Sequence, residues 1–142
     1  MTLPKNRQRF EELINRWINI EDKTIETADD LMGQSTNPML KAIIDLLKRD
    51  SEKHKHTLEA IRHSLDHAVT FTTDDMRVVD TFITKHAMVE KNAVETAQQA
   101  LEMSSLPIPR FLLENLLEDE KKHDAYMDEL NELKLQMAKT TQ

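Results

Sequence analysis

The residues of this 142-residue chain that could do chemistry recur at one fixed spacing. Residues 20–28 (Ile-Glu-Asp-Lys-Thr-Ile-Glu-Thr-Ala) return 69 positions later as residues 89–97 (Val-Glu-Lys-Asn-Ala-Val-Glu-Thr-Ala), so that Glu21 corresponds to Glu90. The same offset relates four further pairs: His54 to His123, Pro38 to Pro107, Asp50 to Asp119 and Lys53 to Lys122. Carboxylates and imidazoles are common ligands of divalent metals. The repeat therefore predicts a duplicated unit that gathers acids and histidines at one point.

Composition favours long helices in a single domain that covers residues 1–142. The chain has one glycine and four prolines, and 32% of its residues are charged. β-Hairpins would need more turn residues and more alternating β-branched residues. Because there is no cysteine, the sequence excludes disulfides, iron–sulfur clusters and thiolate zinc sites.

Charge and hydropathy limit the partners. A net charge of −7 disfavours binding to nucleic acid, which needs a basic surface. No apolar run approaches the roughly 20 residues of a membrane span, so we expect no membrane partner. The N-terminal residues lack the apolar stretch of a secretory signal, which predicts a cytoplasmic location.

Turn and capping residues predict four helices. The first covers about residues 5–32 and stops at Gly33, and the second opens at Asn37-Pro38 and continues to about residue 66. The segment 68–73 is expected to be an extended connection. A third helix follows the cap Thr73-Asp74-Asp75 to about residue 104, and a fourth covers about residues 107–137. The repeat halves are about 8–66 and 77–135.

Each predicted helix carries an apolar stripe that turns polar near its middle. The expected inward residues of the first helix are Phe10, Trp17, Glu21, Thr24, Ala28 and Leu31, and those of the second are Leu40, Ile44, Leu47, Ser51, His54, Leu58, Ile61 and Leu65. In the other two helices the polar positions are His86, Glu90, Glu120 and His123. A buried carboxylate without a partner costs several kcal/mol. A bound cation would neutralise several carboxylates at once, and Glu120 and His123 share one helix face.

With these residues in view, the chain resembles the ferritin-like di-iron carboxylate superfamily, rubrerythrins and bacterioferritins in particular. That family has one glutamate on each of two helices and Glu-x-x-His on each of the other two. Glu21 and Glu90 match the single glutamates, Glu120-Lys-Lys-His123 matches one Glu-x-x-His, and His54 matches the histidine of the other. The resemblance covers roughly residues 8–135. It implies an all-α four-helix bundle of two duplicated hairpins joined by a crossover, in up-down-down-up order.

The chain departs from the family pattern at Ser51, which stands where a bridging glutamate is expected. Asp50 lies one residue away, about 100° around the helix, and could approach only with local distortion. His86 lies one turn before Glu90 and is a candidate replacement ligand. Three alternatives follow: an asymmetric centre that holds two metal ions, a centre that holds one, or a vestige that no longer binds metal.

The remaining histidines are expected to serve other roles. His56 points away from the stripe of His54. His63 and His67 form an i, i+4 pair near the end of the second helix, where cationic side chains favour the helix dipole; a surface metal site is the alternative. Tyr126 lies three residues beyond His123 and is expected to pack, with the metal site as a candidate neighbour.

The resemblance implies an iron centre, with manganese as the alternative, that oxidises Fe(II) or reduces O₂ or peroxide. Glu21 and Glu90 would be terminal ligands, Glu120 a bridge, and His54 and His123 nitrogen donors. Electrons would come from a separate donor, and a homodimer is expected by resemblance. The competing hypothesis is a non-catalytic helical bundle with a degenerate metal site, acting in oligomerisation or partner binding.

Overall fold

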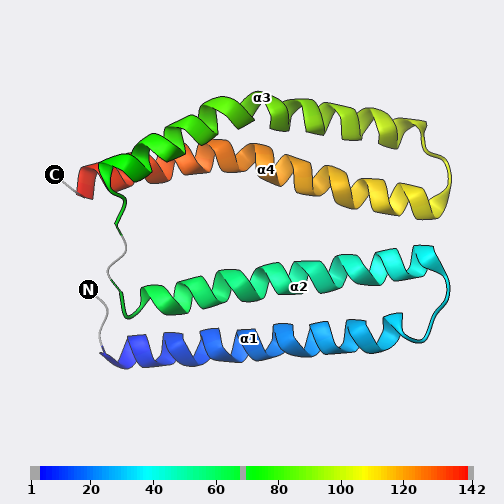
Figure 1. The fold of residues 1–142 in the computed structure, drawn as a ribbon, viewed down its shortest axis with the longest axis horizontal. Coiled ribbons are helices and arrows are strands. Elements are labelled where there is room, and N and C mark those ends of the chain that lie inside the picture. Colours follow the sequence, from blue (N-terminus) through cyan, green and yellow to red (C-terminus); the bar gives the residue numbers. More distant parts are fainter. Residues whose placement is uncertain (1–3, 68–69, 141–142) are drawn as a thin grey trace. The chain divides into compact units, whose positions relative to one another are not determined.

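The computed structural model describes residues 4–67 and 70–140, which form four α-helices (Figure 1). The helices are α1 (Pro4–Met32), α2 (Pro38–Ser64), α3 (Thr73–Met103) and α4 (Pro107–Thr140). No β-strand occurs in these two described ranges. The predicted all-α fold with four helices is confirmed. None of the helices, over the described residues, is long and apolar enough to cross a membrane.

Local capping chemistry explains where the helices begin. The Oδ1 atom of Asn37 accepts hydrogen bonds from the backbone N–H groups of Met39 (2.9 Å) and Leu40 (3.3 Å), and Pro38 occupies the first helical position, as predicted. At α3 the cap is Thr72, one residue earlier than the predicted cap. Thr72 and Asp75 form a reciprocal capping box, which satisfies a backbone N–H at each of the two positions.

The chain divides into two compact units, Met1–Val69 and Thr70–Gln142. The first holds the antiparallel hairpin of α1 and α2, and the second the antiparallel hairpin of α3 and α4 (Figure 1). The two predicted repeat halves fall within these units. We refer to them as the first and second hairpins and describe each by itself.

The connection between α2 and α3 was predicted to be extended over residues 68–73. Among the described residues, its non-helical part before α3 is residues 70–72. Leu65 and Asp66 continue the end of α2 as a turn, with N–H bonds to the carbonyls of Arg62 and His63, both at 3.2 Å. Thr73 already belongs to α3, and Ala68 and Val69 lie outside the described residues. The predicted crossover stays a prediction.

The core of the first hairpin corrects the predicted inward face of α1. Ile14 and Ile18 of α1 pack with Leu58 of α2 in one buried cluster. Phe10 and Trp17 were expected on the inward face, but they are 41% and 52% exposed. Ile14, Ile18, Glu21 and Ala28 share one buried face of the helix, and Trp17 lies at the edge of that face. Phe10, four residues before Ile14, is on the same side of the helix, so helical phase does not account for its exposure.

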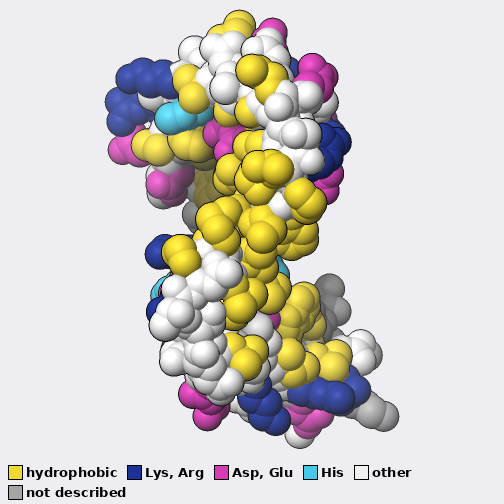
Figure 2. Space-filling model, turned by 90° about the vertical axis from the view of Figure 1, so that its right-hand side faces the viewer, with side chains coloured by type: hydrophobic (Ala, Val, Ile, Leu, Met, Phe, Trp, Pro, Cys, Tyr) yellow, Lys and Arg dark blue, Asp and Glu magenta, His cyan; other side chains and the backbone are white. Residues whose placement is uncertain are grey.

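Both hairpins keep apolar side chains at their surfaces as well as in their cores. In the second hairpin Leu101, Leu117 and Met127 are buried, whereas Val89 is 54% exposed. Leu47 of the first hairpin is 59% exposed. Hydrophobic side chains are visible on the surface of each hairpin in Figure 2.

Ion pairs join the two helices within each hairpin. In the first hairpin Lys48 contacts Asp29 and Lys55 contacts Asp22, each at 2.7 Å. In the second hairpin Lys134 of α4 contacts Asp80 of α3. Exposed pairs of this kind contribute about 1 kcal/mol or less each. Most of the stability of each hairpin must therefore come from its apolar core.

Candidate metal centre

Glu90, Glu120 and His123 form a cluster within the second hairpin, which we call the second-hairpin cluster. Glu90 projects from α3, and Glu120 and His123 project from α4, where their three-residue spacing puts them on one face. Each residue offers one ligand atom, and these atoms all lie within 4.8 Å of one another. His123 Nδ1 is 3.8 Å from Glu90 Oε2 and 4.0 Å from Glu120 Oε1.

Burial and the neighbouring Glu90 both act on the carboxyl group of Glu120. The pKa of Glu120 is raised above its ordinary value, first by burial, and then by the negative charge of Glu90 and a hydrogen bond to it. The nearby His123 opposes this rise in pKa. The negative charge of Glu90 therefore favours the protonated form of Glu120 when no cation is bound. A bound cation would favour the ionised form instead.

The spacing of the second-hairpin cluster suits one metal ion. Ligand atoms at tetrahedral angles around one ion, with bonds of about 2.0–2.2 Å, lie about 3.3–3.6 Å apart. The observed separations of 3.8 and 4.0 Å are a few tenths of an ångström longer than this. Small side-chain rotations would close this difference. Two carboxylates and one imidazole suit Fe(II) or Mn(II).

The equivalent positions of the first hairpin are Glu21, Ser51 and His54, which we call the first-hairpin cluster. Glu21 and Ser51 are 6% and 5% exposed. The Ser51 hydroxyl donates to Glu21 Oε1 at 3.3 Å, and His54 Nδ1 lies 2.8 Å from Glu21 Oε2. Because a carboxylate only accepts, an ionised Glu21 requires the proton on His54 Nδ1. Each oxygen of the buried Glu21 therefore has a protein partner.

This arrangement gives Ser51 a role that the sequence had not suggested. The sequence marks Ser51 only as a missing ligand, because its repeat partner is Glu120. In the structure, the Ser51 hydroxyl stands where the second hairpin has a second carboxylate, and it donates a hydrogen bond to Glu21. The sequence feature that could have indicated this role is a small polar residue on an apolar stripe, opposite the buried Glu21. A buried carboxylate needs hydrogen-bond donors, and a serine hydroxyl can supply one.

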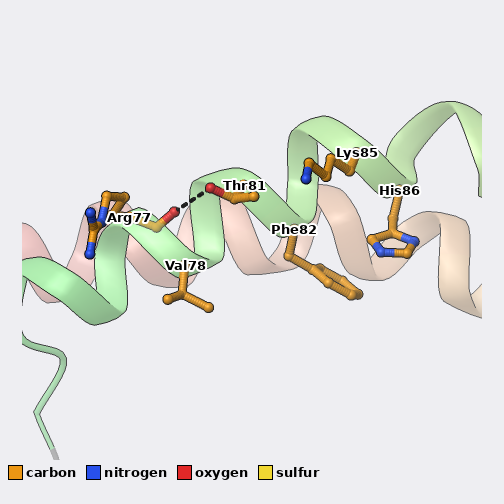
Figure 3. Close-up of a pocket in the computed structure, with 6 residues that line it drawn as sticks. All are labelled: Arg77, Val78, Thr81, Phe82, Lys85 and His86. Atoms are coloured by element: carbon orange, nitrogen blue, oxygen red, sulfur yellow. Dashed lines mark hydrogen bonds between the residues drawn. The ribbon is translucent and has the colours of Figure 1, made fainter.

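Two predicted ligands lie outside both clusters. Asp50 has a side chain that is 55% exposed and pairs with Lys53 at 3.7 Å, in keeping with its place about 100° from Ser51. His86 does not join Glu90, because its ring lies against Phe82, with ring centroids 4.5 Å apart. His86 and Phe82 line a shallow pocket on the surface of α3 with Arg77, Val78, Thr81 and Lys85 (Figure 3).

An aromatic side chain lies beside the second-hairpin cluster. The ring of Tyr126 has its centroid 6.1 Å from that of His123, so Tyr126 neighbours the second-hairpin cluster. Lys122 lies 5.9 Å from the centre of the Tyr126 ring. His56 is exposed on α2, as expected.

The fold and the clusters define an all-α protein of two similar helical hairpins, one with a carboxylate–histidine cluster and the other with a hydrogen-bonded counterpart. Comparison with protein-family models, with curated proteins and with solved structures finds no match to this chain. That the five predicted ligands Glu21, His54, Glu90, Glu120 and His123 share one centre stays a prediction.

Proposed function

We propose that this protein binds one divalent iron or manganese ion through Glu90, Glu120 and His123. The observation that supports this most strongly is the approach of two carboxylates and one imidazole to within 4.8 Å. The pKa of Glu120 is raised first by burial and then by the neighbouring Glu90, so a cation placed between the two carboxylates would stabilise the ionised form of Glu120.

Each residue of the second-hairpin cluster would have a separate role. Glu90 and Glu120 supply the negative charge that offsets the charge of the ion. His123 supplies a neutral nitrogen donor, which favours transition metals over magnesium or calcium. Only the ionised Glu120 binds a cation, so metal binding would compete with protonation of this carboxylate.

The chemistry that fits this ligand set is oxidation of Fe(II), with O₂ or peroxide as the electron acceptor. Bound iron would supply the one-electron redox step, as the ferritin-like resemblance implies. Three protein ligands would leave coordination positions open for the acceptor. Since the chain has no cysteine, repeated turnover would need electrons from a separate donor.

Metal analysis of the full chain, purified without chelators and then loaded with Fe(II) or Mn(II), tests the binding claim. We expect about one ion per chain, and a loss of that ion in Glu120→Gln, which keeps size and removes charge. The matched control is Glu118→Gln, because Glu118 lies on the same helix with a side chain that is 75% exposed. Metal retained by Glu120→Gln would contradict the proposal.

The redox claim needs its own measurement. Aerobic Fe(II) addition, followed by absorbance, should show oxidation faster than in a Glu90→Ala variant. Equal rates for the two proteins would reject the oxidase chemistry while leaving metal binding intact.

A second candidate function is a non-catalytic helical module for oligomerisation or partner binding. The exposed apolar side chains favour it, among them Trp17 at 52% and Leu47 at 59% exposure. The hydrogen bonds that satisfy Glu21 without a metal also favour it. Light scattering on metal-free protein tests it: a monomer at all concentrations would count against self-association.

A further inference from the structure

Tyr126 lies next to the second-hairpin cluster, on the same helix as His123. The centroids of the two rings are 6.1 Å apart, and their planes differ by 41°. Aromatic rings with centroids about 4.5–7 Å apart are neighbours in contact. The sequence has one tyrosine and no cysteine, so no second phenol and no thiol competes with Tyr126 as an electron donor.

The electron count of the proposed iron site gives this contact a chemical meaning. Reduction of hydrogen peroxide to two molecules of water takes two electrons and two protons. One bound Fe(II) ion supplies a single electron when it becomes Fe(III). A site that holds one ion therefore needs a second electron from a neighbouring group, because the one-electron reaction would release a hydroxyl radical.

The surroundings of Tyr126 suit the loss of an electron together with a proton. Its phenol carries an O–H group, and the residue is 41% exposed, so water can accept the proton. Lys122 Nζ lies 5.9 Å from the centre of the Tyr126 ring. A positive charge at this distance opposes a second positive charge on the ring. It therefore favours the neutral phenoxyl radical over a charged oxidised ring.

We propose that Tyr126 is the second electron donor when Fe(II) bound at the second-hairpin cluster reduces peroxide. This inference rests on the iron site proposed above. In the balanced step, Fe(II), the Tyr126 phenol, one H₂O₂ and one proton give Fe(III), a Tyr126 phenoxyl radical and two water molecules. The O–O bond of peroxide and the O–H bond of the phenol break, and O–H bonds of water form.

The fate of the radical follows from its exposure. A separate electron donor restores the phenol together with a proton. In the absence of that donor, the radicals of two chains couple through a carbon–carbon bond, and the displaced ring protons return to the phenol oxygens. The product is dityrosine, which in this chain can join only Tyr126 to Tyr126.

Anaerobic loading of the full chain with Fe(II), followed by one equivalent of H₂O₂, tests the inference. We expect a tyrosyl radical in electron paramagnetic resonance and then a dityrosine cross-link in mass spectrometry. The matched variant combines Tyr126→Phe with Phe111→Tyr, which keeps one tyrosine on α4 at similar exposure, since Phe111 is 46% exposed. Residue 111 lies roughly 18 Å along the helix from His123. Radical and cross-link yields should be at least tenfold lower in this variant.

The ratio of iron oxidised to peroxide consumed is a second readout. The parent chain should oxidise about one Fe(II) for each H₂O₂, whereas Tyr126→Phe should oxidise about two, because iron must then supply both electrons. Iron content before the peroxide step should be the same in the parent and in both variants.

Equal radical and cross-link yields in the parent and in the double variant would overturn the inference, because they would indicate a freely diffusing oxidant. Bound iron that gives no tyrosyl radical would reject this inference alone. A parent chain that takes up no iron would reject the iron site and this inference together, so the two failures are distinguishable.

Discussion

His123 Nδ1 lies 3.8 Å from Glu90 Oε2, whereas the equivalent atoms of His54 and Glu21 lie 2.8 Å apart. The first pair is too far apart for a hydrogen bond and the second pair forms one. Among the three equivalent positions of the two clusters, the difference accompanies one change, Ser51 in place of Glu120. One hairpin thus satisfies its buried acid with protein donors, and the other leaves two acids facing one imidazole.

Ser51→Ala should destabilise the protein by about 1–2 kcal/mol, because it removes a hydrogen bond to a charged and buried partner. Glu21 Oε1 would lose its hydroxyl donor. Urea unfolding measures the change. Ser64→Ala is the control, since the Ser64 hydroxyl bonds locally to the Ile61 carbonyl at an exposed position. An equal effect of the two substitutions would contradict the role assigned to Ser51.

Ser51→Glu should restore the symmetry of the repeat and add a second metal ion per chain. Without metal, the added carboxylate beside Glu21 should cost about 1–3 kcal/mol, because two acids would then share a buried position. Metal analysis and thermal unfolding with and without Mn²⁺ measure both effects. Ser51→Gln matches the size without the charge and should gain no ion; a second ion there would refute the explanation.

Metal affinity should rise with pH through the raised pKa of Glu120, because only its ionised form binds a cation. The contribution of Glu120 to the stability of the metal-free protein should fall as the pH rises. With the folded pKa above the unfolded one, the stabilising contribution of the protonated Glu120 is complete below the unfolded pKa and is lost as pH rises through the folded pKa. Mn²⁺ titrations and metal-free unfolding across this range measure the two trends. Glu120→Gln should abolish both, and trends that persist in this variant would assign them to other groups.

Leu58→Ala should destabilise the protein by about 2–5 kcal/mol, because it opens a cavity in a packed core. Leu58 is 3% exposed and contacts Ile14 and Ile18. Leu47→Ala on the same helix is the control, because Leu47 is 59% exposed and should cost under about 1 kcal/mol. Denaturant unfolding compares the two variants, and similar losses would show that the core is placed wrongly.

The sequence predicted most of the helical architecture, because its signals are local. Asn37-Pro38 and Gly33 mark helix ends whatever the tertiary packing. The inward face of α1 was harder, since Trp17 and Ile18 are adjacent and both apolar, and only packing against Leu58 decides between them. The repeat predicted one centre for Glu21, His54, Glu90, Glu120 and His123, and the structure brings together Glu90, Glu120 and His123 within the second hairpin. The ring contact of His86 with Phe82 and the bond from Ser51 to Glu21 depend on side-chain rotamers, which spacing does not determine.

The most direct test of the central claim is the metal content of the full chain after anaerobic loading with Fe(II) and removal of free metal. The account predicts about one ion per chain, lost in Glu120→Gln and kept in Glu118→Gln. No bound iron or manganese in the parent chain, or equal content in all three proteins, would contradict it.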